Sequence, residues 1–167
     1  MLKLSRPRAA HVIWLVVFVV FCVVSDRIVK QLILENFALH EQLDILPGIF
    51  RLTYTRNTGG AFSAFSGASW LFHVFVPVAV LLLLFSMLSG VVSRPLGVVS
   101  ATAMIGGAIG NYIDRLVYGY VVDMFDFYLI DFAVFNLADC YITVGCVLLM
   151  ICVLFFPEEK KVTPCAN

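Results

Sequence analysis

Four long apolar runs, separated by short polar connections, constrain the fold of this 167-residue chain more than any other feature. A helix that crosses a bilayer needs about 20 mainly apolar residues, and the runs that meet this requirement are approximately 12–34, 69–89, 96–115 and 136–156. Hydrophobic residues make up 62% of the chain and charged residues 13%, whereas a soluble domain has about half and about a quarter. The sequence therefore predicts a mainly α membrane protein with four transmembrane helices.

The first run also admits a second interpretation. Only Val12 to Val24 is purely apolar, which is about the length of a signal-peptide core, so a cleaved signal would account for it. No small-x-small cleavage motif follows, and a helix that crosses the membrane must continue through Asp26, Arg27 and Lys30. We treat this run as a span that carries charged residues.

Positive charges predict the orientation of the spans. They precede the first run, follow the second and follow the fourth: Lys3, Arg6, Arg8, Arg94, Lys160 and Lys161. Cytoplasmic loops carry the excess of Lys and Arg, so we expect both termini and the 90–95 loop in the cytoplasm. The connections at about 35–68 and 116–135 then lie outside.

The two outer connections differ in character. The first alternates β-branched and aromatic residues around a Pro47-Gly48 turn signal, which predicts a small sheet at about 43–65. The second is rich in aromatic residues, which commonly occupy the membrane interface. With no internal repeat and no long linker, the chain is expected to form a single integral membrane domain over 1–167.

Polar residues gather at the predicted outer ends of the spans. Ionisable groups inside spans are costly, and by default they indicate function. The cluster comprises Asp26, Lys30, Asn111, Asp114, Arg115, Asp123, Asn136 and Asp139. Structural roles are also available for these residues, because an i, i+4 pair such as Asp26 and Lys30 can neutralise itself. Asn136 is likewise a good N-cap, with Asp139 at the third helical position.

Several chemistries are disfavoured by what the sequence lacks. "HEQLD" has no second histidine at the spacing of a zinc protease, and no histidine stands beside a serine elbow. The five cysteines form no CxxC pair and are interpreted as small apolar residues. A formal net charge of zero without a basic patch argues against nucleic-acid binding. Two aspartates that activate a water remain, with Asp123 and Asp139 as the most suitable pair.

Five motifs in order resemble one known family. "DRIVK" (26–30), "NTGGAF" (57–62), "GGAIGNYIDR" (106–115), "VVDMF" (121–125) and "FNLADCYITVG" (135–145) are similar to those of bacterial lipoprotein signal peptidase, the type II signal peptidase. The resemblance extends from Asp26 to Gly145. It differs in detail, since Arg27 stands where the family often has Gln.

The resemblance implies an aspartic endopeptidase that cleaves prolipoproteins before a diacylglyceryl-modified cysteine. It places the catalytic pair on Asp123 and Asp139, and supporting positions on Asp26, Lys30, Asn57, Asn111, Arg115 and Asn136. No metal or organic cofactor is expected, and the partners are prolipoprotein substrates and membrane lipid. We further expect a monomer in the bacterial inner membrane, with the site near the outer face beside a small sheet and a short outer helix.

Two other functions remain open at this stage. A small transporter or ion-relay protein could also use interfacial carboxylates, and it would line a polar path through the membrane. A non-catalytic assembly factor could dock partners on the outer sheet, and it would not require both Asp123 and Asp139.

Overall fold

The computed structural model describes residues 9–59 and 70–156. Its elements are α1 (Ala9–Asn36), β1 (Gln42–Leu46), β2 (Phe50–Asn57), α2 (Trp70–Leu88), α3 (Pro95–Tyr118), β3 (Val121–Asp126), the 3-10 turn η2 (Tyr128–Ile130) and α4 (Leu137–Phe155). All four α-helices are long and apolar enough to cross a membrane. Each coincides within a few residues with a predicted span, so the four-helix membrane fold is confirmed.

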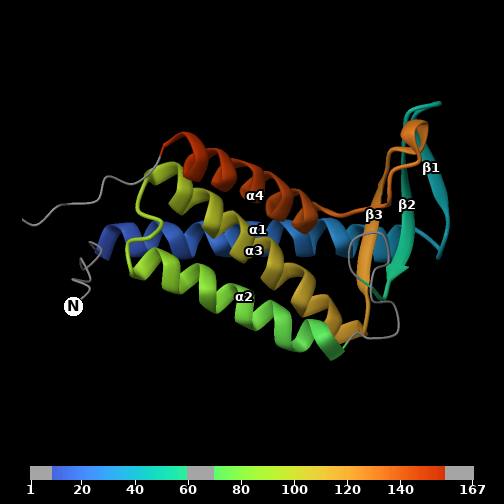
Figure 1. Cartoon of the computed structure of the whole chain (residues 1–167). Helices are drawn as coiled ribbons and strands as arrows, with labels where there is room; N and C mark the ends of the chain where they lie inside the picture. The colour runs from blue at the N-terminus through green and yellow to red at the C-terminus, as the bar shows by residue number, and fades with distance from the viewer. Residues whose placement is uncertain (1–8, 60–69, 157–167) are drawn as a thin grey trace, which may run out of the picture.

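Helix α3 is the central element of the bundle, because it packs against α1, α2 and α4 (Figure 1). Small residues allow these close contacts. A Cβ atom at Gly110 would lie 2.7 Å from a carboxylate oxygen of Asp26 on α1. A Cβ atom at Gly145 of α4 would lie 2.7 Å from the Ser100 carbonyl oxygen on α3. Gly110 therefore leaves room for the Asp26 side chain, and Gly145 lets α4 approach the backbone of α3.

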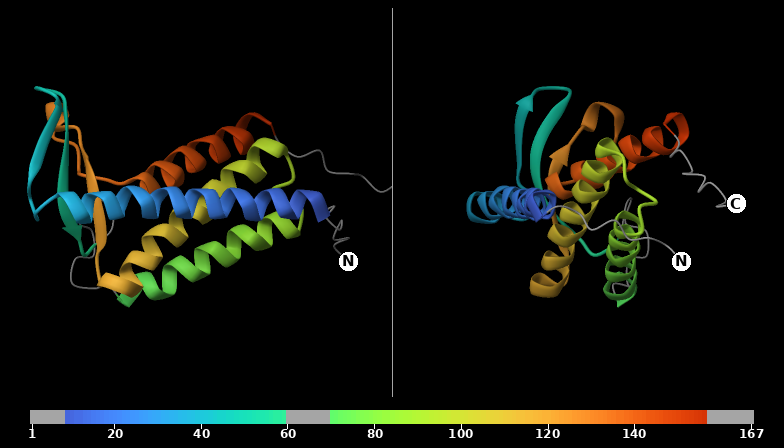
Figure 2. Two further views of the ribbon diagram at one scale, coloured as in Figure 1. Left: turned by 180° about the vertical axis from the view of Figure 1, so that it is seen from behind. Right: turned by 90° about the vertical axis from the view of Figure 1, so that its left-hand side faces the viewer.

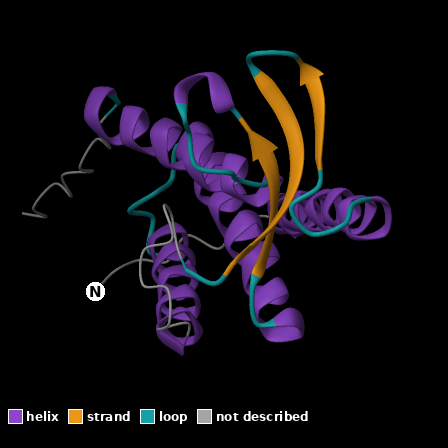
Figure 3. Cartoon of the chain, turned by 90° about the vertical axis from the view of Figure 1, so that its right-hand side faces the viewer, coloured by secondary structure: helices purple, strands orange, loops and turns teal. Residues whose placement is uncertain are grey.

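The three strands form one antiparallel sheet in the order β1, β2, β3. Its strands run across the end of the bundle, and β3 lies nearest to the helices (Figures 1 and 3). The predicted Pro47-Gly48 turn joins β1 to β2, with Gly48 in the left-handed region at φ 83°. Residues 60–65, the end of the predicted sheet region, lie outside the described residues.

Strand β3 occupies part of the connection at 116–135 that we expected to be an aromatic interfacial loop. Val122 and Met124 pack with Ile33 of α1 and Tyr54 of β2 in a buried apolar cluster. Five of the six residues of β3 are buried, so both of its faces are covered. A strand covered on both faces lacks the clear alternation of apolar and polar residues that identifies strands in a sequence.

Burial in the bundle is reversed relative to a soluble protein. Large apolar side chains such as Trp14, Phe85 and Leu154 are more than half exposed, and no residue of α2 is buried. The buried charged side chains of the described residues are instead Asp26, Lys30, Asp114, Asp123 and Asp126. Such a surface suits a hydrocarbon environment, with polar groups enclosed by protein.

The connections alternate between the two ends of the bundle. The start of α1, the turn from α2 to α3 and the end of α4 lie at one end, and the sheet lies at the other (Figures 1 and 2). The four helices therefore alternate in direction, as the sequence predicts. The polar side chains named above belong to the sheet end.

The Gly145 contact can be tested by adding a single carbon atom. We expect Gly145→Ala to destabilise the protein by about 1–3 kcal/mol, because α3 and α4 must separate to admit the methyl group. Thermal unfolding in detergent measures the effect. Val153→Leu on the same helix also adds one carbon, but at a site that is 60% exposed, and it should leave the unfolding temperature unchanged. Equal unfolding temperatures for the two variants would contradict the close packing.

Candidate active site

The first turn of α4 is built around Asn136. The Asn136 side-chain oxygen accepts a hydrogen bond from the Asp139 backbone N–H at 2.9 Å. One carboxylate oxygen of Asp139 accepts from the Asn136 backbone N–H at 3.2 Å. This reciprocal pair is a capping box, which confirms Asn136 as the N-cap and Asp139 as the third helical residue. The cap also fixes the orientation of the Asp139 carboxylate.

Strand β3 brings Asp123 to the same place from the other side. Its carboxylate is 1% exposed, and both oxygens accept hydrogen bonds from amide groups. Asn136 Nδ2 donates to Asp123 Oδ1 at 2.6 Å, and Asn57 Nδ2 donates to Asp123 Oδ2 at 2.9 Å. Asn136 therefore contacts both predicted catalytic carboxylates.

Asn111 of α3 joins the two halves of this arrangement. Its Nδ2 donates to Asp139 Oδ1 at 2.7 Å, while its Oδ1 accepts from Asn136 Nδ2 at 3.1 Å. The buried ammonium of Lys30 also donates to Asn111 Oδ1, at 2.8 Å. Because both of these groups are donors, the amide oxygen of Asn111 must face them, and its NH₂ group must face Asp139.

The remaining predicted residues surround this centre. Arg115 donates from Nη2 to the Gly59 carbonyl oxygen at 2.8 Å, and its guanidinium lies 4.2 Å from the Phe72 ring centroid. Asp26 forms an ion pair with Lys30 at 2.8 Å, and both side chains are fully buried. The fold thus gathers into one cluster all eight residues that the resemblance assigned to the catalytic pair and to its supporting positions.

Asp114 is a further member of the cluster and joins helix α1 to strand β3. It forms ion pairs with Lys30 at 2.9 Å and with Arg27, both on α1. It also accepts a hydrogen bond from the Val122 backbone N–H of β3 at 3.2 Å. The ion pairs join residues so far apart in the chain that they leave no local sequence pattern.

The environment of Asp123 changes its acidity. Burial is the largest cause, and the negative charge of Asp139 is the second; together they raise the pKa of the Asp123 carboxyl to about 7. The hydrogen bonds from Asn57 and Asn136 act in the opposite direction and are outweighed. A carboxyl group that holds its proton near neutral pH is what an acid and base pair requires.

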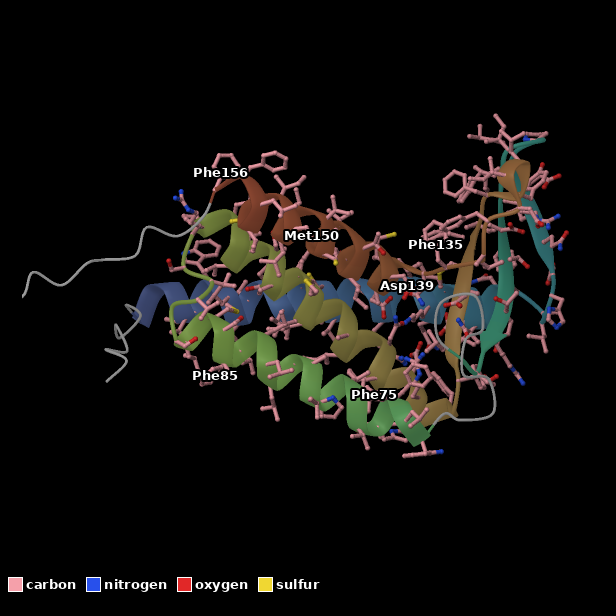
Figure 4. The ribbon with its side chains drawn as sticks, viewed as in Figure 1. Phe75, Phe85, Phe135, Asp139, Met150 and Phe156 are labelled. Atoms are coloured by element: carbon pink, nitrogen blue, oxygen red, sulfur yellow. The ribbon has the colours of Figure 1, made fainter. Side chains whose placement is uncertain are left out.

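A pocket of about 590 Å³ adjoins the cluster and reaches away from it between the helices. Its polar lining includes Asn57, Asn111, Arg115 and Asp139 at the cluster, and Thr143 one turn further along α4. Apolar side chains of α2, α3, α4 and residues 132–135 form most of the remaining wall. Figure 4 shows Asp139 among the nitrogen and oxygen atoms that gather at the sheet end of the bundle, whereas carbon predominates toward the other end. The pocket therefore offers one polar end and a long apolar wall.

One histidine makes a packing contact, and the described cysteines keep the structural interpretation made from the sequence. His73 packs edge-on against the Tyr112 ring, with centroids 5.7 Å apart. The four cysteines that the structure describes are free, and Cys22 and Cys152 are buried. Cys165 lies outside the described residues.

Fold and site together define a multi-pass membrane protein with a hydrogen-bonded aspartate pair beside an apolar pocket. The family described as "Signal peptidase (SPase) II" matches residues 18–155. The chain belongs to this family, and it is a peptidase of a bacterial membrane.

Individual relatives agree with this assignment. A lipoprotein signal peptidase of a Nostoc species is 44% identical over 154 residues, covering 90% of this chain and 94% of its own. That of Lactococcus lactis subsp. lactis is 39% identical over 144 residues, covering 86% and 95%. A bacterial membrane enzyme solved in meso at 2.3 Å resolution superposes with a TM-score of 0.81 at 28% identity, covering 89% of this chain and 94% of that one. The fold of four helices and a small sheet is thus shared with a solved structure.

The acidity of Asp123 can be measured directly by infrared spectroscopy of the detergent-solubilised protein. We expect a protonated-carboxyl band that is present below pH 7 and lost above it, with a midpoint at about 7. Asp123→Asn should remove this band. Asp44→Asn, which changes an exposed carboxyl of β1, should leave it in place. A wild-type band that disappears near pH 4, the usual value for an aspartate, would contradict the raised pKa.

Proposed function

We propose that this chain removes signal peptides from prolipoproteins, with Asp123 and Asp139 as the catalytic pair. Membership of the signal peptidase II family supports the reaction. The single observation that carries the residue assignment is that Asn136 hydrogen-bonds both carboxylates at the polar end of a largely apolar pocket. This arrangement can hold a water molecule between an acid and a base.

In our proposal Asp139 is the general base. Both of its oxygens accept N–H groups, from Asn111 and from the Asn136 backbone. Its position in the first turn of α4 also places it in the positive field of the helix N-terminus. Asp139 also lines the pocket, where water and substrate can reach it.

Asp123 is then the protonated partner. As Asp139 takes a proton from the attacking water, the hydroxyl oxygen forms a bond to the scissile carbonyl carbon, and the protonated Asp123 stabilises the developing oxyanion. Collapse of this intermediate breaks the C–N bond, and the proton held by Asp139 passes to the leaving amine. Asp123 is not among the residues that line the pocket, but Asn57, its hydrogen-bond partner, is. We therefore place the scissile carbonyl next to Asn57. In this proposal the Asn57 amide rotates away from Asp123 and toward the substrate.

The supporting residues fall into two groups. Asn111 and Asn136 hold the two carboxylates, and Asp26 and Lys30 hold Asn111 and the start of α4. Arg115 binds a backbone carbonyl at Gly59, so it is suited to hold the chain that borders the pocket. Asn57 contacts both groups, because its amide oxygen accepts from the Gly59 backbone N–H and its NH₂ group donates to Asp123.

The proposed substrate carries diacylglycerol on the cysteine that follows the scissile bond. The pocket wall between α2 and α4 is apolar, as acyl chains require, and its polar end lies at the carboxylates. A substrate anchored in the lipid can therefore enter sideways between these helices. We place the sheet end at the outer face of the bacterial inner membrane and both termini in the cytoplasm, following the positive charges. We treat the chain as a monomer.

A transporter is the alternative, and burial argues against it. A polar path would have to continue from the carboxylates toward the other end of the bundle. The buried Ser100 and Thr102 lie that way on α3, but each hydroxyl donates to a carbonyl of its own helix. The charged side chains that are buried among the described residues all belong to the sheet end.

Removal of either carboxyl tests the catalytic assignment. We expect Asp123→Asn and Asp139→Asn each to reduce prolipoprotein cleavage by on the order of 10³-fold or more, because the acid or the base is lost. Cleavage in detergent is followed by mass analysis of the product. Asp44→Asn on the exposed β1 strand is the matched control and should cleave normally. Near-normal turnover by a folded Asp123→Asn or Asp139→Asn protein would end the assignment, and ion flux in proteoliposomes would favour the transporter.

The pH dependence tests which aspartate is protonated. Activity requires the proton on Asp123, whose pKa is about 7, so kcat/KM should be level up to about one pH unit below that value and about half as large at it. It should fall about tenfold per pH unit above it. The rate is measured from pH 5 to 9 with one lipidated substrate. A plateau that extends to pH 9 would show that the reaction does not need this proton.

A further inference from the structure

Two fully buried carboxylates outside the catalytic pair make equivalent contacts. Asp26 Oδ1 accepts the backbone N–H of Ala138 at 2.9 Å. Asp114 Oδ2 accepts the backbone N–H of Val122 at 3.2 Å. Ala138 immediately precedes Asp139, and Val122 immediately precedes Asp123. Each of these carboxylates therefore holds the chain one residue before a proposed catalytic aspartate.

Both carboxylates meet on one ammonium group. Lys30 Nζ lies 2.8 Å from Asp26 Oδ2 and 2.9 Å from Asp114 Oδ2. Its third partner is the Asn111 oxygen at 2.8 Å. An ammonium has three N–H donors, and Lys30, which is fully buried, lies within hydrogen-bonding or ion-pair distance of three oxygen atoms. A buried cation with this many charged partners is held firmly in place.

A neighbouring cation balances the charge of this group. Asp26 and Asp114 bring two carboxylates, and Lys30 brings one ammonium. Arg27 supplies the second cation through its ion pair with Asp114. Its guanidinium also lies 5.5 Å from the Tyr118 ring centroid and donates to the Tyr118 hydroxyl. Uncompensated buried charge is costly, and the formal charges of these four side chains sum to zero.

We propose that Asp26, Lys30 and Asp114 form a clamp that sets the separation of Asp123 and Asp139. The connection runs from the Val122 N–H through Asp114, Lys30 and Asp26 to the Ala138 N–H. It joins strand β3 to helix α4 from the side of α1 and α3. The three residues are positioning residues, and their effect on catalysis rests on the proposed function of the aspartate pair.

The clamp helps to keep the two carboxylates together although one belongs to strand β3 and the other to helix α4. β3 and α4 are joined through residues 127–136, and the β-bridge between Phe125 and Phe135 aligns only their backbones. Asp26 can reach Ala138 only because Gly110 has no side chain, since a Cβ atom there would lie 2.7 Å from the Asp26 carboxylate. A displacement of about 1 Å in a catalytic group can reduce the rate on the order of 100-fold.

Two double variants with the same charge test the clamp. Arg27→Gln/Asp114→Leu keeps the charge of the buried group at zero and approximates the shape of Asp114, but it has no oxygen to accept from Lys30 or Val122. Arg27→Gln/Asp114→Asn has the same charge and keeps one such oxygen. We expect kcat to fall on the order of 100-fold in the leucine variant, with KM unchanged, and to fall by less than about tenfold in the asparagine variant.

Hydrogen exchange supplies a readout that does not depend on catalysis. In the leucine variant, exchange should increase in peptides that contain Val122 and also in those that contain Ala138, because the two sites are linked through Lys30. The asparagine variant should retain protection at both. Asp114 has no direct contact with Ala138 among the contacts of the described residues, so a merely local role would increase exchange at Val122 alone.

Several results would overturn the clamp. Equal kcat values in the two double variants would do so, as would increased exchange at Val122 without any increase at Ala138. If the leucine variant does not fold, Asp26→Asn/Lys30→Met replaces it, since it keeps both N–H acceptors and zero net charge but removes the link. Wild-type kcat in that variant would likewise overturn the proposal. Failure of the proposed function is a different result, namely full activity of Asp123→Asn, and the exchange experiment tests the clamp even then.

Discussion

The site depends on one side chain, Asn136, and on the requirement that its buried amide be fully hydrogen-bonded. The side chain is 0% exposed; its oxygen caps α4, and its NH₂ group binds both Asp123 and Asn111. In a low-dielectric environment an unpaired amide is costly, so only the arrangement that satisfies every partner is stable. The start of α4, the β3 strand and the central helix α3 therefore all meet at this one residue.

Around that amide, polar and charged groups are enclosed by protein while the apolar side chains face outward. Lys30, Asp26 and Asp114 can be buried because each donor finds an acceptor and the charges balance with Arg27. Close helix packing is the condition for this balance, and the glycines of α3 and α4 make it possible. The same enclosure raises the pKa of Asp123, so stability and acid–base chemistry have a common physical origin.

The sequence predicts the parts of this structure that have a local signature. Hydropathy identifies all four spans, and the Pro47-Gly48 turn marks the β1–β2 hairpin. Asn136 can be recognised as an N-cap because capping involves residues only three apart in the sequence. Strand β3 was not predicted, because its two covered faces remove the alternation that marks a strand. The ion-pair partners of Asp114 were not predicted either, because they lie on α1, 84 and 87 positions earlier in the chain. The family motifs indicated which residues assemble, but not how they are connected.

The sheet lies across the end of a bundle whose helices are long enough to span the membrane (Figure 1). One of the two aspartates belongs to strand β3 of the sheet and the other to the first turn of α4. The carboxylates are therefore fixed at one depth of the bilayer. In the proposed function, the scissile peptide bond of a lipid-anchored substrate reaches the carboxylates only if it lies at the same depth. The distance between that bond and the substrate's lipid anchor determines its depth. A substrate can thus be selected by the position of its scissile bond along the membrane normal, rather than by an extended sequence around that bond. Such selection tolerates many different signal peptides with a single pair of carboxylates.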